Sequence, residues 1–182
     1  MKKFLAFAAA AVVALGAAAQ NMYIGGSVGF QQTKQADDKT TTIDIMPEIG
    51  YNLSDSWAIG TTAGVDYSKT GDRKFTLVAF APYARYTFLR SGIVSVFCDG
   101  GVDLGFGKAS VGGESSKTAV AYGIGIKPGL SLTVNDKFGF VAHVGFFGYN
   151  GANKAAKDGG YPTVAGFNLN GNDLSVGFYY NF

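Results

Sequence analysis

The sequence predicts an all-β fold: an eight-stranded, antiparallel, up-and-down barrel that crosses a membrane. The last ten residues alternate, with Leu174, Val176, Phe178, Tyr180 and Phe182 on one face and Ser175, Gly177, Tyr179 and Asn181 on the other. Charged residues make up 15% of the chain, against about 25% in a soluble domain. After the N-terminal segment no apolar run reaches the roughly 18 residues of a membrane helix. Strands that close on themselves are then the remaining way to cross a bilayer.

The N-terminal segment, residues 1–19, is typical of a cleaved secretory signal peptide. Lys2 and Lys3 precede an apolar run from Phe4 to Leu15, and the small residues Ala17 and Ala19 follow. The alternative, a retained membrane anchor, needs a longer apolar segment. We therefore expect a signal peptide at 1–19 and one barrel domain at 20–182.

Eight alternating segments follow, and their connections also alternate in length. The predicted strands are 22–33, 40–53, 56–68, 73–89, 92–107, 117–134, 137–149 and 173–182. Connections 52–56, 90–92 and 135–137 are tight turns, whereas 34–39, 69–72, 108–116 and 150–172 are longer and richer in Gly, Lys, Asp and Asn. Short turns at one end, long loops at the other and an even strand number are typical of bacterial membrane barrels, with both chain ends on the short-turn side.

The two faces of each predicted strand differ in a way that indicates which one meets lipid. In segment 40–53, Ile43, Ile45, Ile49 and Tyr51 oppose smaller or polar residues. A soluble barrel such as a lipocalin would instead carry charged residues outside and apolar ones inside. Expected outward aromatics gather near strand ends in two belts: Tyr51, Trp57, Tyr86, Phe88, Phe138, Tyr180 and Phe182 at the turn end, and Phe30, Tyr67 and Phe106 at the loop end. Prolines inside three strands, Pro47, Pro82 and Pro128, predict local bulges or bends.

The signal peptide, the opening strand Tyr23–Phe30, the alternating turns and the Tyr179–Phe182 ending resemble the outer-membrane β-barrel domain family, the small OmpA/OmpX-like, porin-family-like barrels. The resemblance covers essentially the whole chain after residue 19. It implies a monomeric barrel in the outer membrane of a Gram-negative bacterium, with both termini periplasmic. It also implies that the assembly machinery reads Phe182 and the final strand.

If the apolar faces look outward, eight ionisable side chains point into the lumen: Asp44, Glu48, Asp66, Arg85, Asp99, Asp103, Lys127 and His143. Counted from the turn end, Glu48, Arg85, Asp99, Lys127 and His143 lie at similar heights, which predicts an ion-pair network that plugs the bore. Asp44, Asp66 and Asp103 lie higher and have no obvious cationic partner. The alternative is a gated or cation-preferring path. We favour a satisfied polar interior, because eight strands leave room only for side chains.

Other function classes find little support in the sequence. The formal charge of +2 comes from Lys2 and Lys3, which leaves 13 basic against 13 acidic residues, so no basic surface for nucleic acid is expected. We expect no cofactor, no metal site and no catalytic residue. A lipid-modifying enzyme is the least favoured alternative, because the one His lies in mid-strand and no G-x-S-x-G nucleophile elbow is expected: Gly25–Gly29, which fits that spacing, lies inside the predicted strand 22–33 and not at a strand-to-helix turn.

The loops at the far end are the expected contact surface. In 150–172, Tyr161, Val164, Phe167 and Leu169 could extend the barrel wall or touch an unidentified surface ligand, although a mobile solvated loop is slightly favoured. Nine Lys and Arg against six acids in and beside the four loops favour the phosphates of lipopolysaccharide, alongside outer-membrane lipid. The sequence therefore predicts a structural or surface-interaction barrel, with a small passive porin-like channel as the alternative.

Overall fold

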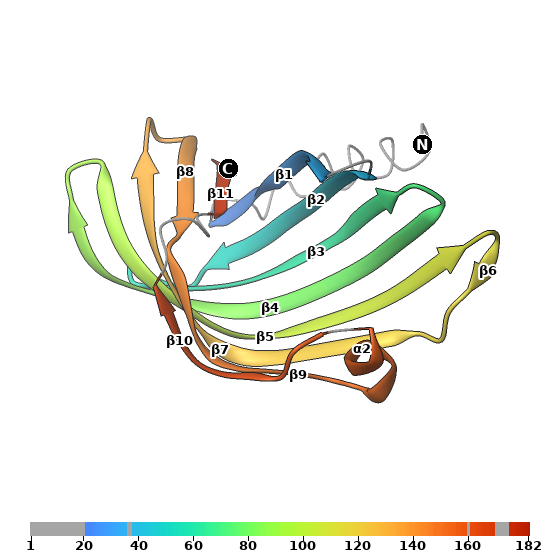
Figure 1. The fold of residues 1–182 in the computed structure, drawn as a ribbon. Coiled ribbons are helices and arrows are strands. Elements are labelled where there is room, and N and C mark those ends of the chain that lie inside the picture. The colour runs from blue at the N-terminus through green and yellow to red at the C-terminus, as the bar shows by residue number, and fades with distance from the viewer. Residues whose placement is uncertain (1–20, 36–37, 160, 170–174) are drawn as a thin grey trace.

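The computed structural model describes residues 21–35, 38–159, 161–169 and 175–182, which form an antiparallel barrel of long, curved strands (Figure 1). The predicted signal peptide, 1–19, lies outside the described residues. The elements are β1 Met22–Gln35, β2 Asp38–Asn52, β3 Trp57–Thr70, β4 Arg73–Ser91, β5 Val94–Val111, β6 Glu114–Ser115, β7 Ala119–Thr133, β8 Phe138–His143, β9 Gly145–Ala152, helix α2 Lys154–Asp158, β10 Val164–Leu169 and β11 Ser175–Asn181.

Strand pairing closes the barrel as the sequence predicts. Each strand from β1 to β5 pairs with the next, β5 pairs with β7, and β7 pairs with β8. β11 then joins β8 to β1, with Tyr23 opposite Asn181 and Gly26 opposite Phe178. Next to this seam, the Phe182 N–H donates to the Met22 carbonyl at 3.1 Å, so the two ends of the barrel domain lie side by side.

The predicted seventh strand, 137–149, is two strands in the structure. β7 pairs with β8 through Gly129 and His143, but it pairs with β9 through Ile126 and Phe147, so one extra residue has entered the wall between them. That residue is Val144, whose N–H donates to the Pro128 carbonyl at 3.0 Å. The insertion reverses the facing of β9 relative to β8, as β-bulges do.

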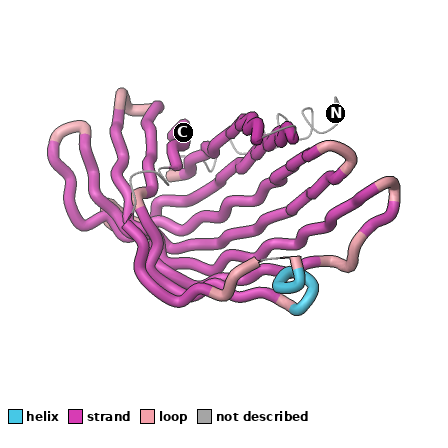
Figure 2. The backbone as a smooth tube through the Cα atoms, viewed as in Figure 1, coloured by secondary structure: helices cyan, strands magenta, loops and turns pink. Residues whose placement is uncertain are grey.

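The long connection 150–172 is not a mobile loop over its described part, and the expectation that it would be was wrong there. β9 continues to Ala152, α2 follows, and β10 returns antiparallel along β9, with Phe167 opposite Phe147 (Figure 2). The Asn153 side chain caps α2 by accepting from the Ala156 N–H, and it also accepts from the Val120 N–H of β7. β10 thereby adds to the barrel wall beside Gly145–Asn150 of β9, and it does not carry the wall past the end of β9.

The β3–β4 and β5–β6 connections, at the same end of the barrel as α2, are shorter than predicted, because the strands run further than the alternation indicated. β3 and β4 are joined by residues 71–72 alone, with Gly71 at a φ of +56°, and β5 ends two residues before β6, with Gly112 at +60° and Gly113 at +95°. Left-handed backbone at a tight turn is where glycine carries no steric penalty. We call this the loop end of the barrel; the opposite, turn end carries residues 53–56, 92–93 and 134–137.

The outer wall is apolar, as predicted. On β2 the outward Ile45 is 54% exposed, whereas its neighbours on the strand, Asp44 and Met46, are only partly exposed. Aromatic pairs line the turn end, with Trp57 against Tyr86 at 4.8 Å between ring centroids and Phe138 against Tyr180 at 5.2 Å. No helix among the described residues is long and apolar enough to cross a membrane.

Prolines affect the ladders less than expected. Pairing is interrupted beside Pro47 and Pro82 without a shift of register, so the predicted bulges are absent at these two sites. A register shift falls instead between Thr87 and Leu89, so that Arg90 lies opposite Ser95. At Pro128 the irregularity lies in the partner strand, at Val144.

Candidate functional site

The centre of the lumen holds a buried, bidentate ion pair. Arg85 on β4 lies directly opposite Asp99 on β5. The guanidinium donates from Nε to Asp99 Oδ1 and from Nη2 to Asp99 Oδ2, both at 2.7 Å. Arg85 is 9% exposed and Asp99 4%. Two parallel charge-assisted bonds of this kind fix both position and orientation.

His143 and Glu48 join this pair from the two sides of the closing seam. The Nε2 atom of His143 on β8 lies 2.8 Å from Asp99 Oδ2, and Arg85 Nη2 lies 3.7 Å from Glu48 Oε1 on β2. The structure thus brings together four of the five residues for which the sequence predicts a shared layer. Arg85 and Asp99 lie on adjacent strands, whereas His143 and Glu48 come from strands that pair with neither β4 nor β5, so the curvature of the closed barrel brings them to the pair.

Two tyrosines complete the hydrogen bonding of Glu48 and a third is bonded to one of them; the sequence reasoning did not single out any of the three. Tyr83 and Tyr179 donate their hydroxyl groups to the two oxygens of Glu48. The hydroxyl oxygens of Tyr23 and Tyr83 lie 2.6 Å apart. The sequence could have placed them in the lumen, because each Tyr occupies the face of its strand that otherwise carries small or polar residues. We call the assembly the Arg85 layer; it consists of Glu48, Arg85, Asp99, His143, Tyr23, Tyr83 and Tyr179.

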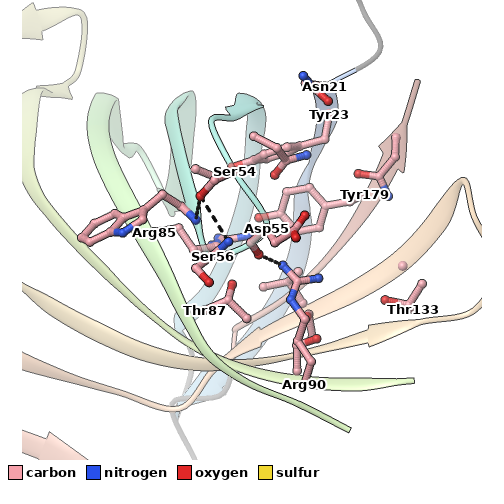
Figure 3. Close-up of a pocket in the computed structure, with 18 of the residues that line it drawn as sticks. Asn21, Tyr23, Ser54, Asp55, Ser56, Arg85, Thr87, Arg90, Thr133 and Tyr179 are labelled. Carbon is pink, nitrogen blue, oxygen red and sulfur yellow. Dashed lines mark hydrogen bonds between the residues drawn. The ribbon is translucent and has the colours of Figure 1, made fainter. Parts of the chain in front are cut away.

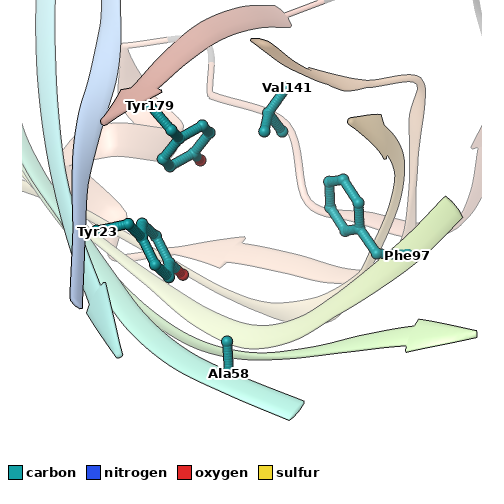
Figure 4. Packing of buried hydrophobic residues seen from close by; sticks show 5 residues of the cluster. All are labelled: Tyr23, Ala58, Phe97, Val141 and Tyr179. Carbon is teal, nitrogen blue, oxygen red and sulfur yellow. The ribbon is translucent and has the colours of Figure 1, made fainter. Parts of the chain in front are cut away.

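Aromatic rings surround the guanidinium of Arg85. Its Cζ lies 4.1 Å from the ring centroid of Phe97 and 5.2 Å from that of Tyr83, within the range of cation–π attraction. Figure 4 shows the side chains of Tyr23, Phe97 and Tyr179 projecting into the ring of strands. Phe97 is the largest fully buried side chain of the described residues, at 1% exposure.

Inward glycines make room for these rings. A Cβ at Gly50 would meet the ring of Tyr23, and a Cβ at Gly129 would meet the ring of Phe97. A Cβ at Gly25 would lie 2.6 Å from Cδ1 of Tyr179. The Gly-rich inner face is therefore the space in which the aromatic part of the Arg85 layer lies.

The Arg85 layer lies between two cavities that share no lining residue. A vestibule of about 450 Å³ opens at the turn end and is lined by Ser54, Asp55, Arg90 and Thr133, among others (Figure 3). Arg90 donates to the Asp55 carbonyl at its rim. A cavity of about 60 Å³ on the other side is lined by Glu48, Asp99, Asp103, Lys127 and His143, among others.

Lys127 does not join the Arg85 layer, so the predicted membership of Lys127 in that layer was wrong. Its Nζ donates to Asp103 Oδ1 at 2.6 Å, so the expectation that Asp103 has no cationic partner was wrong. Backbone register places Lys127 opposite Asp99, but the oxygens of Asp99 already bind Arg85 and His143. The side chains of Lys127 and Asp103 are 38% and 35% exposed, so this pair is far wetter than the Arg85 layer.

Asp44 and Asp66 lie nearer the loop end and face each other across β2 and β3. The structure gives neither a cationic partner within 4.0 Å among the described residues, as the sequence indicated. Within the described part of the chain, no three His, Cys, Asp or Glu side chains are grouped closely enough to hold a metal ion.

Comparison with known proteins adds a family and a fold. The family model described as "Outer membrane protein beta-barrel domain" matches residues 4–182. Among solved structures, the crystal structure of Neisserial surface protein A (NspA) is similar, with a TM-score of 0.60 and 16% sequence identity. The match covers 88% of this chain and 97% of the NspA chain. A search of curated protein sequences finds no match.

Proposed function

Because the chain belongs to the outer membrane protein beta-barrel domain family, we propose that it is a structural or surface-interaction barrel of the outer membrane whose bore is blocked by the Arg85 layer. The position of that layer between the two cavities carries the proposal. A solute entering the vestibule from the turn end would meet Arg85 held by Asp99 and Glu48. Displacing it would leave charges buried without partners, which costs several kcal/mol.

The alternative is a small passive channel, and the vestibule is the observation that favours it. Its lining is rich in hydroxyl and amide groups, including Ser54, Ser56, Thr87 and Asn181, which suits water or small polar solutes. In this alternative the Arg85 layer would be a gate that opens, and the wet Lys127–Asp103 pair would lie on the path beyond it.

Single-channel recording in planar bilayers separates the two functions. We expect the native protein to give no steady conductance, and Arg85→Ala to give openings, because removing the guanidinium joins the two cavities. Arg90→Ala is the matched control, since it removes an arginine from the vestibule but not from the layer. Steady native conductance that persists after Arg85→Ala and Lys127→Ala would overturn the plug in favour of the channel.

The same proposal includes an orientation. Met22 and Phe182, which meet at the turn end, are placed on the periplasmic side with both termini, and the β9–α2–β10 arch is placed at the cell surface. Along the arch, Tyr161 and Val164 are 41% and 46% exposed, which supports contact with a surface ligand there, whereas Phe167, 62% exposed, lies opposite the outward Phe147. Phe182 is assigned the role of assembly signal on the final strand, and the barrel is proposed to act as a monomer.

A lipid-modifying activity is not proposed. His143, the one histidine, is engaged with Asp99 in the middle of the lumen, and its ring stacks edge-on against Phe97 at 5.5 Å. Lipid A mass spectra from cells with and without the gene provide the check, because a lost or gained acyl chain would require an enzyme.

A further inference from the structure

Five lysines lie on the outward face of the first five strands, beyond the apolar part of the wall toward the loop end. Lys69 shares its strand face with the outward Tyr67, and Lys108 shares its face with Phe106. All five are exposed. We call them the lysine row; it consists of Lys34, Lys39, Lys69, Lys74 and Lys108.

The lysine row brings like charges directly opposite one another. Lys34 pairs in register with Lys39, and Lys69 pairs with Lys74. Like charges directly across a strand pair destabilise a sheet. Among the side chains that the structure describes, no carboxylate lies within 4.0 Å of any of the five ammonium groups, so this part of the chain provides them with no anion.

The level of the lysine row along the wall is constant relative to the aromatic belt at the turn end. On each of three strands a lysine stands twelve residues from a belt aromatic: Lys39 from Tyr51, Lys69 from Trp57, and Lys74 from Tyr86. Twelve residues span about 40 Å of strand, or about 30 Å along the membrane normal for strands tilted by 35–45°. Since the hydrocarbon layer is about 30 Å thick or less, the ammonium groups lie at the headgroups of the opposite leaflet.

We propose that the lysine row binds the phosphate groups of lipopolysaccharide in the outer leaflet, with Lys69 and Lys74 sharing one phosphate. The inference rests on the proposed orientation, which puts the loop end outside the cell. The proposed site also lies on one side of the barrel only, because outward residues on β7 and β9 near the same end, such as Tyr122 and Tyr149, are uncharged. Bound lipid A should therefore be found against β1–β5.

Native mass spectrometry of the detergent-purified barrel with bis-phosphorylated lipid A tests the site. We expect the double variant Lys69→Gln with Lys74→Gln to weaken binding about tenfold or more, because two charge-assisted contacts are lost. The control is Lys154→Gln with Lys157→Gln, which removes the same charge from α2 and should leave binding within about twofold. Dephosphorylated lipid A should bind the native protein as weakly as the row variant does.

Stability in two media gives a second readout that a merely misfolded variant cannot imitate. In a nonionic detergent the row variant should be at least as stable toward urea as the native barrel, since a like-charge pair is removed. Added lipid A should then stabilise the native barrel and the α2 control more than the row variant. Equal lipid A effects in all three proteins would overturn the proposal. Conductance does not depend on the row, so a conducting barrel would overturn the plug alone.

Discussion

At the scale of single residues, Arg85 is the point on which the lumen contacts converge. Two carboxylates and four aromatic rings surround one guanidinium. A buried ion pair of this kind is no proof of high stability, because desolvating the charges offsets their attraction. Removing one partner is a different matter, since the other charge then stays buried alone.

Asp99 and Asp103 allow this difference to be measured with the same chemical change. Asp99→Asn should lower the free energy of unfolding by about 3–5 kcal/mol, because Arg85 loses its bidentate partner in a buried site. Asp103→Asn should cost about 0–1 kcal/mol, because its pair with Lys127 is more than a third exposed. Urea unfolding in lipid or detergent provides the measurement, and equal losses would show that the two pairs are equally hydrated.

A second prediction concerns the effect on stability of adding a methyl group at a glycine of the inner face. Gly129→Ala should cost about 1–3 kcal/mol, because its Cβ would press on the ring of Phe97 and lie 2.8 Å from the Ala142 carbonyl oxygen. Gly100→Ala is the control: no atom lies within 4 Å of its Cβ position, so its effect should be small. The same unfolding assay compares the two. A Gly129→Ala protein as stable as the control would mean that the lumen can expand.

Sequence reasoning finds the inward charged residues but not how they pair. Alternation assigns Asp99, Lys127 and Arg85 to the lumen, since a charge on the lipid face is costly. It does not reveal that Asp99 is occupied by Arg85 and His143, which leaves Lys127 to reach Asp103. That outcome depends on register across the strands and on competition between neighbours, and neither is encoded in the local pattern.

At the scale of elements, one residue determines the facing of a whole strand. A period-two pattern through 137–149 predicts that every second residue faces outward along the whole segment. In the structure the outward residues are even-numbered before Val144 and odd-numbered after it. The bulge allows His143 to face Asp99 while Phe147 and Tyr149 remain on the outer wall. The sequence alone could not locate this bulge. Whether the even-numbered or the odd-numbered residues of 137–149 face outward, apolar residues lie on the outer face over part of the segment. The strand β10 was missed for a related reason: its alternation is weak, and pairing with β9 organises it.

Deleting Val144 should therefore leave the facing of both strands intact. Without the extra residue, plain alternation from the inward His143 keeps Phe147 outward, and the pairing with β7 continues in register. Deleting Gly148, in the regular part of β9, should instead turn Tyr149 toward the lumen and Asn150 toward lipid, which costs several kcal/mol for the unpaired amide. The folded fraction, measured by heat-modifiable migration on gels, should stay near the native level for the first deletion and fall sharply for the second. A sharp loss on deleting Val144 would mean that the bulge itself is needed for folding.

At the scale of the whole molecule, the proposed orientation predicts which tips can be reached from outside. An epitope inserted between Gly112 and Gly113 should be labelled by antibody on intact cells, because the β5–β6 hairpin lies at the loop end. The same epitope inserted in the turn 53–56 should be labelled only after the outer membrane is permeabilised. The reverse pattern would invert the orientation, and it would place the lysine row in the inner leaflet.

The overall architecture could be predicted from the sequence because membrane crossing constrains every strand in the same way. Outward positions must be apolar, backbone groups must pair, and the chain must close. The length of the strands beyond the membrane is not constrained in this way. That is why β1, β3 and β5 run further than expected, with only residues 71–72 between β3 and β4 and only residues 112–113 between β5 and β6.

The hydrogen bond from the Phe182 N–H to the Met22 carbonyl joins the beginning and the end of the wall. A short linker between them, with new ends cut at Gly112–Gly113, would give a circularly permuted chain that closes through the same pairings. Such a chain would bury the natural carboxyl end inside a continuous polypeptide. Refolding of the permutant in detergent, compared with its insertion in cells, would separate what Phe182 contributes to the fold from what it contributes as a terminus.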